Sequence, residues 1–307
     1  MNHLDKQFML INSKPRRLSL SMIVCVLVFD LIWFPFSAIS ISRSSLAVLV
    51  AIAGVFLLAG RIQRRYELSA ATKNLAVEIY ILVLFGVVGF IFSYLVIESG
   101  WTIRDDLFAA IDSALGFDWR TYTLFFLQND LLWLSSLILY VMSPIFVGFA
   151  LFWFCMKGDF NRASEIVAMV ILGGILCVVI SGIFPSAGGS NYFPLDNEFY
   201  RGYMIIFDNS YGAEFFRLRD GVGIEVSLLH PLALIAFPSY HACLSLLVML
   251  YFWGTGVIGG IIVALSLASL LSLPVQGGHH LSDVLGGLFT GTVAYWLVRQ
   301  HLKVRNH

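Results

Sequence analysis

Long uninterrupted runs of apolar residues dominate this sequence of 307 residues. A helix needs about 20 such residues to cross the hydrocarbon core of a bilayer. Eight runs approach or exceed that length, at residues 18–41, 45–60, 75–97, 131–156, 164–184, 232–253, 256–273 and 281–298. The sequence therefore predicts an all-α, polytopic membrane helix bundle with about eight spans.

The overall composition agrees with a membrane protein and excludes a soluble enzyme. Charged residues make up 12% of the chain, about half of the usual share in a soluble domain. The net charge is zero, so no general attraction to nucleic acid is expected. The four cysteines lie in apolar runs without a CxxC pair, which argues against a disulfide framework or a zinc ribbon.

The distribution of basic residues predicts how the spans are oriented. If the N-terminus is cytoplasmic, the short inner segments hold 13 of the 19 lysines and arginines, and the outer segments hold six. Short cytoplasmic loops are normally the richer in basic residues. We therefore expect both termini in the cytoplasm of a multi-pass plasma membrane or bacterial inner membrane.

Two long segments are expected on the outer side. Residues 98–130 place Trp101, Phe108 and other apolar residues at helical spacing, as in a helix that lies at the membrane surface. On this segment Asp112 and Asp118 are expected to be solvated. Residues 185–231 show no period, and a loop of that length is usually either functional or disordered. Its many aromatic residues argue against simple disorder.

Four of the seven histidines map to the outer side, namely His230, His241, His279 and His280. His241 lies where the sixth apolar run meets that face. His279 and His280 lie between the seventh run and the eighth. Two span ends that are far apart in sequence can therefore meet at one membrane depth, and this convergence marks the candidate site.

Asp283 follows His279 by four residues, so the two share one face of a helix. The carboxylate can then hold one imidazole nitrogen and leave the other free as a nucleophile or base. Ser239 follows Pro238 at the start of a helix, where free amides bind anions such as phosphate. The alternative is that Ser282, Asp283 and Ser239 only cap helices.

The segments FPSYHA (237–242) and GGHHLSDVLGG (277–287), with IDSALGFDW (111–119) upstream, carry a family resemblance. They resemble the type 2 phosphatidic acid phosphatase superfamily, and most of all its branch of inositol phosphorylceramide synthases and inositolphosphotransferase-like bacterial membrane proteins. The likeness covers roughly residues 105–300. It implies a catalytic membrane domain at 98–307 with that superfamily's core helix bundle, and it leaves the spans of 1–97 unexplained.

The resemblance also implies a mechanism that needs no metal or other cofactor. His279 would attack the phosphorus of a lipid phosphate or phosphodiester and form a phosphohistidine, with Asp283 orienting it. His241 would protonate the leaving alcohol. Water, or an acceptor alcohol in a transferase, would then take the phosphoryl group. His280 would at most be a supporting hydrogen-bond donor.

The sequence departs from the superfamily in two places. The first signature, Lys-x6-Arg-Pro, is absent, and Arg219 is our candidate for gripping phosphate, together with Ser239 and the amide of Gly278. The alternative for Arg219 is a solvated loop arginine, and Arg217 is a weaker candidate. The third signature normally has an arginine six residues before its histidine, where this chain has Leu273.

Two other functions stay open at this stage. One is a metal-dependent lipid hydrolase that uses His241, His279, His280 and Asp283 as ligands, since imidazoles and a carboxylate suit zinc. The other is a non-catalytic transporter or binder of lipid headgroups. Of the remaining features, Asp30 is a carboxylate within the first span, and Gly287-x3-Gly291 is expected to pack helices.

Overall fold

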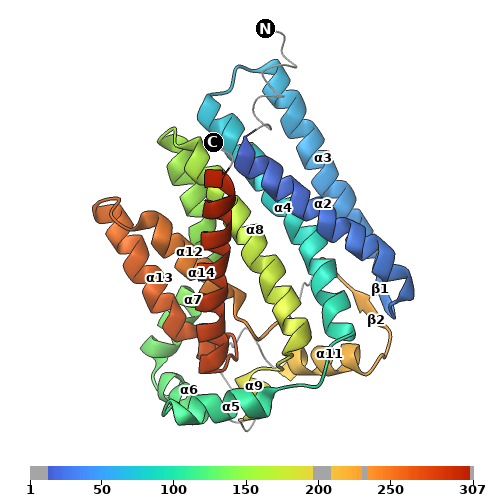
Figure 1. Cartoon of the computed structure of the whole chain (residues 1–307), viewed down its shortest axis with the longest axis vertical. Coiled ribbons are helices and arrows are strands. Elements are labelled where there is room, and N and C mark those ends of the chain that lie inside the picture. Colours follow the sequence, from blue (N-terminus) through green and yellow to red (C-terminus); the bar gives the residue numbers. More distant parts are fainter. Residues whose placement is uncertain (1–12, 196–208, 230–233, 305–307) are drawn as a thin grey trace.

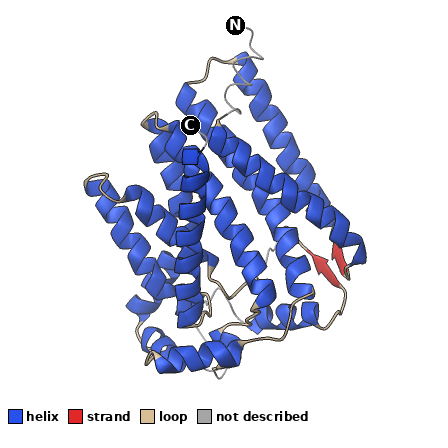
Figure 2. Ribbon diagram, viewed as in Figure 1, coloured by secondary structure: helices blue, strands red, loops and turns tan. Residues whose placement is uncertain are grey.

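The structure is a computed structural model, and it describes residues 13–195, 209–229 and 234–304. Its fold is almost entirely helical (Figure 2). The long helices are α2 (Lys14–Trp33), α3 (Arg43–Arg65), α4 (Ala70–Glu98), α7 (Asp130–Met156), α8 (Phe160–Ile183), α13 (Val257–Gln276) and α14 (Leu281–Val304). The shorter elements are η1 (Phe34–Phe36), α5 (Asp105–Ala114), α6 (Trp119–Leu127), α9 (Gly189–Tyr192), α11 (Asn209–Arg219) and α12 (Tyr240–Phe252), with strands β1 (Ile39–Ile41) and β2 (Ile224–Val226).

Among the residues that the structure describes, seven helices are long and apolar enough to cross a membrane, which confirms the predicted fold class. The predicted span at 232–253 is the exception, because α12 has only 13 residues. At 1.5 Å per residue such a helix measures about 20 Å, too short for a hydrocarbon core of about 30 Å. The chain before it is non-helical from 234 to 239, so α12 begins inside the bundle rather than at its surface.

The first span is also shorter than predicted. Helix α2 ends at Trp33 and is followed by the short 3-10 helix η1, which contains Pro35, and then by β1. Proline lacks the amide that would continue the helical hydrogen bonds. Residues 37–41 therefore leave the helix and become extended.

Helix α8 lies at the centre of the bundle, with α2 and α4 on one side and α12 and α14 on the other (Figure 1). Its sequence is apolar on every face, as expected for a helix surrounded by others. Ile166, Val167, Met169 and Ile171 of α8 are completely buried. The first spans therefore share one hydrophobic core with the rest of the chain.

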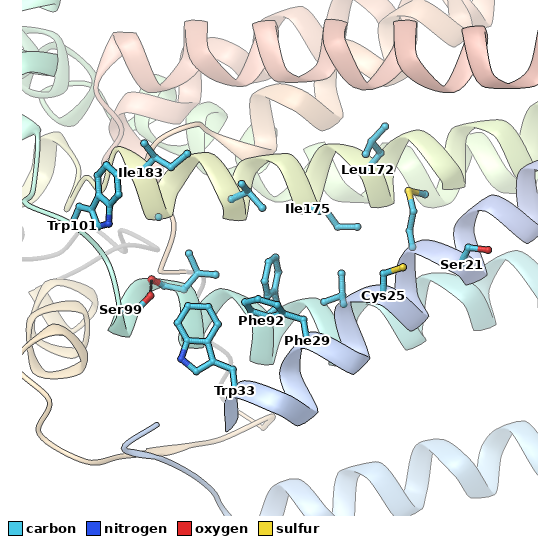
Figure 3. Close-up of a pocket in the computed structure, with 15 residues that line it drawn as sticks. Ser21, Cys25, Phe29, Trp33, Phe92, Ser99, Trp101, Leu172, Ile175 and Ile183 are labelled. Carbon is cyan, nitrogen blue, oxygen red and sulfur yellow. Dashed lines mark hydrogen bonds between the residues drawn. The ribbon is translucent and has the colours of Figure 1, made fainter. Parts of the chain in front are cut away.

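Figure 3 shows an apolar groove of about 660 Å³ where α2, α4 and α8 meet. Phe29 and Trp33 of α2 line it together with Phe92 of α4 and Ile175 of α8. Phe29 packs edge-on against both Trp33 and Phe92. The aromatic side chains thus hold the C-terminal half of α2 against α4 and leave a gap beside α8.

The short helices α5, α6, α9 and α11 gather at one end of the bundle, and the start of α2 and the end of α14 lie toward the other (Figure 1). At the first end, β1 pairs in parallel with β2, with Ile39 opposite Ile224. The hydroxyl of Ser45 accepts the amide of Leu228 at 2.8 Å and contacts the carbonyl of Val226 at 3.2 Å. These bonds fasten the link between the first two membrane helices to the segment at 209–229.

Candidate active site

The loop between α13 and α14 meets the start of α12 at the end of the bundle that carries the short helices. There, His279 Nδ1 lies 3.3 Å from Asp283 Oδ2, and His279 Nε2 lies 3.2 Å from Ser239 Oγ. All three side chains are buried, with exposures of 4%, 0% and 0% for His279, Asp283 and Ser239. The carboxylate, the imidazole and the hydroxyl thus form one chain of contacts.

Local sequence explains why these groups meet. Ser239 caps α12, accepting the amide of Ala242 at 3.4 Å, and its own amide donates to the carbonyl of Asp283 at 2.9 Å. Gly278 has φ +61°, and a Cβ there would lie 2.2 Å from Ser190 Oγ. Its carbonyl accepts the amide of Ser190 at 3.1 Å. Only glycine gives the loop both this backbone conformation and this close approach.

His241 occupies the first turn of α12, and its ring stacks on Tyr140 with centroids 4.5 Å apart. His241 and His279 both line a cavity of about 330 Å³. The rest of its wall is mostly apolar and comes from α4, α7, α8, α12 and the chain before α12. The apolar lining residues include Leu82, Phe85, Gly86, Gly89, Phe90, Val170, Gly174, Val178, Leu234 and Ile235. The two imidazoles therefore face a cavity whose walls are mostly apolar.

His280 points to a different set of groups. It is completely buried, with Nε2 3.5 Å from Asp105 Oδ1 and Nδ1 3.4 Å from Asp112 Oδ2. Burial alone would lower the pKa of His280, but the two carboxylates outweigh it and raise the pKa to about 9. Burial would raise the pKa of Asp112, but hydrogen bonds from His280, Ser282 and Leu281 lower it.

The expectation that Asp112 is solvated is wrong, because its side chain is 2% exposed. The segment at 98–130 forms two short helices, and Trp101 and Leu115 are exposed while Phe108 is buried against Phe237. Asp105 and Asp112, seven residues apart, lie on the buried face of α5 beside Phe108. The spacing of the apolar residues alone did not predict that these carboxylates share the buried face. Asp118 is exposed and caps α6.

Arg219 lies at the end of α11, where its guanidinium donates to the carbonyls of Gly100 and Trp101 and packs over Phe215. Burial lowers its pKa. It is therefore a helical residue bound to the α4–α5 connection, and its contact with phosphate stays a prediction. Arg217 is exposed and lies 3.9 Å from Glu214.

Leu273, at the position of the missing arginine, is completely buried in an apolar cluster with Tyr140, Ala242 and Val284. The side-chain amide of Gln276 donates to Ser136 at 2.9 Å. The space that an arginine would occupy is thus filled by hydrocarbon.

The geometry does not gather the four ligands of the metal-dependent alternative. His280 faces the carboxylates of α5, whereas His279 faces Ser239. Over residues 13–195, 209–229 and 234–304, no group of three His, Cys, Asp or Glu side chains is placed to hold a metal ion. His230, the fourth outer histidine, lies outside the described residues.

A comparison with protein-family models matches residues 106–297 to the PAP2 superfamily. That segment covers more than half of the chain and contains Ser239, His241, His279 and Asp283. The chain belongs to the PAP2 superfamily. Membership indicates a multi-pass membrane enzyme of the lipid phosphatase or phosphotransferase type. No curated protein and no solved structure matches the chain.

Proposed function

We propose that this PAP2 protein transfers or hydrolyses the phosphoryl group of a lipid phosphate or phosphodiester through a phosphohistidine at His279. One observation carries the proposal: His279, oriented by Asp283, shares a mostly apolar cavity with His241. A site for a soluble phosphate ester would not need such walls. A lipid places its phosphate at the imidazoles and its hydrocarbon against the cavity.

In the first step, the lone pair of His279 Nε2 attacks phosphorus. The N–P bond forms as the bond from phosphorus to the leaving oxygen breaks, and His241 gives that oxygen a proton. Asp283 holds the Nδ1 proton of His279 and so stabilises the positive charge that develops on the ring. Ser239 Oγ lies 3.2 Å from Nε2, and its hydroxyl would donate a hydrogen bond to an oxygen of the bound phosphoryl group.

In the second step, an acceptor hydroxyl gives its proton to His241 and attacks phosphorus, and the N–P bond breaks. Water as acceptor gives hydrolysis, and a second alcohol gives transfer. Apolar walls of this kind disfavour water at the reacting phosphorus, which would favour transfer. This agrees with the resemblance to inositolphosphotransferase-like proteins. That branch favours a bulky residue where classical lipid phosphatases have a glycine, and this chain has Tyr240 there. Tyr240 donates to the carbonyl of Val170 at 3.0 Å and forms part of the wall.

The developing phosphate charge needs fixed donors, which act strongly in a site without water. The free amides at the start of α12, the Ser239 hydroxyl and the Gly278 amide are the nearest candidates. Arg219 is proposed to act from the edge of the site, through the guanidinium nitrogen Nη1 that forms no hydrogen bond within the described residues. This donor set makes the proposed reaction independent of metal ions.

We place the site on the extracytoplasmic side, because the basic residues predict cytoplasmic termini. A cysteine-labelling experiment would test this independently of activity. A single cysteine at exposed Asp118 should react in intact cells with a reagent that does not cross membranes, and one at exposed Lys157 should not. The reverse pattern would invert the proposed topology.

The decisive assay measures phosphate or headgroup release from a panel of lipid phosphates and phosphodiesters by purified protein. Wild type should be active, His279→Ala inactive, and His301→Ala, in the polar C-terminal region, unchanged. Wild-type protein should also form an acid-labile, alkali-stable phosphoryl adduct that His279→Ala lacks. Dependence on an added alcohol such as inositol would identify a transferase. Equal activity of wild type and His279→Ala, or loss of activity with a chelator, would refute the mechanism.

A further inference from the structure

We propose that His280 is a positioning residue whose imidazolium, between Asp105 and Asp112, ties helix α5 to the loop that carries His279. The proposal rests on the function proposed above where it concerns catalysis. The tie itself is a structural claim that can be tested without any substrate.

The first argument is the arrangement of charge. The His280 ring is completely buried and lies 3.5 Å from Asp105 Oδ1 and 3.4 Å from Asp112 Oδ2, one carboxylate at each nitrogen. These distances exceed the 2.7–2.9 Å of a strong charge-assisted hydrogen bond. The attraction is therefore mainly electrostatic, and it requires that the ring carry its positive charge.

The second argument is what else the two carboxylates hold. Asp112 accepts the amides of Leu281 and Ser282, both at 2.8 Å, at the first turn of α14. Asp105 accepts the Ser186 hydroxyl at 2.6 Å and the Ala187 amide at 3.0 Å. Helix α5 thus fixes the residues just after His279 and also the segment that leads into α9.

The third argument is that, among the described residues, no lysine or arginine contacts these carboxylates directly, although Arg219 attracts Asp105 without forming an ion pair with it. In the described part of the chain, neither Asp105 nor Asp112 forms an ion pair with a lysine or arginine. The other neighbours of the His280 ring are Phe108, Tyr192 and Phe193. Without the imidazolium, two buried carboxylates would face a neutral ring with no ion-pair partner in contact, which disfavours the folded arrangement.

The tie acts on the catalytic pair through Asp283. Asp283 Oδ2 accepts the backbone amide of His280 at 2.9 Å and also contacts His279 Nδ1 at 3.3 Å. A shift of His280 therefore moves the carboxylate that orients His279. Partners that orient a reactive side chain are commonly worth about 10- to 100-fold in activity.

The pH dependence follows from the same charges. The facing titratable groups are Asp105 and Asp112 on α5, Asp283 on α14 and Tyr192 on α9. Because the pKa of His280 is raised from 6.5 to about 9, its stabilisation is complete below pH 6.5. It is lost as the pH rises through about 9.

Hydrogen exchange measured by mass spectrometry on the detergent-solubilised full chain tests the tie. His280→Gln removes the charge, and Asp112→Asn removes one carboxylate with little change of shape. At pH 7 both should speed exchange in peptides covering 105–117 and 277–290 by about tenfold or more. Asp106→Asn, a neighbouring carboxylate that bonds Tyr192 instead, should leave these peptides unchanged.

Two further readouts separate a charge effect from a mere loss of packing. In wild type, protection corrected for intrinsic exchange should fall between about pH 8 and 10, and in His280→Gln it should be flat. On any active substrate, Asp112→Asn should lower kcat about 10- to 100-fold with little change in KM. Unchanged exchange in His280→Gln, equal loosening by Asp106→Asn, or flat wild-type protection to pH 10 would overturn the proposal. Loosened peptides in an enzyme inactive on every substrate would refute the proposed function and leave the tie intact.

Discussion

Replacing Gly287 by alanine should separate α14 from α12 at the level of the active site. Gly287 packs directly against the start of α12, where a Cβ would lie 2.1 Å from the carbonyl oxygen of Ser239 and 2.8 Å from the Cβ of Ala242. Both obstacles are rigid, because one is backbone and the other is the first side-chain atom of a residue near the start of a buried helix.

The magnitude follows from the distances. Ordinary van der Waals contact begins at 3.4 Å, so the two helices must separate by about 1.3 Å at this point. Overpacking of this kind costs about 1–3 kcal/mol. Because Ser239 and Asp283 are joined by a backbone hydrogen bond, the shift also misplaces the groups around His279. A misplacement of about 1 Å can lower a rate about 100-fold.

Thermal unfolding of the purified variants, followed by tryptophan fluorescence in one detergent, measures the first effect. Gly287→Ala should lower Tm by several degrees, and Gly291→Ala, whose Cβ would meet α12 at 3.2 Å, by less. Gly260→Ala is the matched control, since nothing lies within 4 Å of its Cβ, and it should keep or raise Tm. A Tm of Gly287→Ala equal to wild type, or an equal fall in Gly260→Ala, would refute the reasoning.

Three other changes have defined outcomes. Glu78→Gln should cost about 3–5 kcal/mol in unfolding free energy, because it breaks a buried ion pair at 2.7 Å and removes the carboxylate that balances the buried charge of Arg16; the double change Arg16→Met with Glu78→Met should cost less than the single one, and a larger cost would contradict this. Ser45→Ala should cost about 1–3 kcal/mol, because it leaves the buried end of the β1–β2 link unsatisfied, and an unchanged Tm would show that water replaces the hydroxyl. His241→Asn should lower phosphate release about 10²- to 10⁴-fold at unchanged Tm, while His301→Asn retains full activity; normal release by His241→Asn would exclude it as the proton donor.

The sequence predicted the features that depend on residue type over long stretches. Apolar runs of about 20 residues located seven helices of the bundle. The contact of His279 with Asp283 was also predicted, but not its geometry, because His279 lies in the loop before α14 and not on the helix itself. The proximity of Ser239 to His279 followed from two span ends meeting at one depth. The positions of the helices rest on a length that the backbone itself imposes.

What the sequence could not predict depends on tertiary contacts. Nothing local distinguishes buried Asp112 from exposed Asp118, which lies six residues further on the same segment, since the difference is that His280 and the start of α14 cover the former. Residues 234–239, just before α12, are mostly apolar, yet they form an irregular segment with a bend at 237–238 instead of a helix. Arg219 lies on helix α11 and not in a loop. The sequence of this stretch shows no clear helical period, so the helix could not be predicted from it.

The cavity beside His279 draws its walls from residues inside the segment that matches the superfamily and from residues before it. The imidazoles and the carboxylate come from residues 106–297, which match the superfamily, whereas Phe85, Gly86, Gly89 and Phe90 come from α4, which precedes that match. Side chains larger than glycine at 86 would enter open space rather than strike a neighbour. The length and shape of the hydrocarbon that fits can therefore be altered through α4 alone, without changing Ser239, His241, His279 or Asp283.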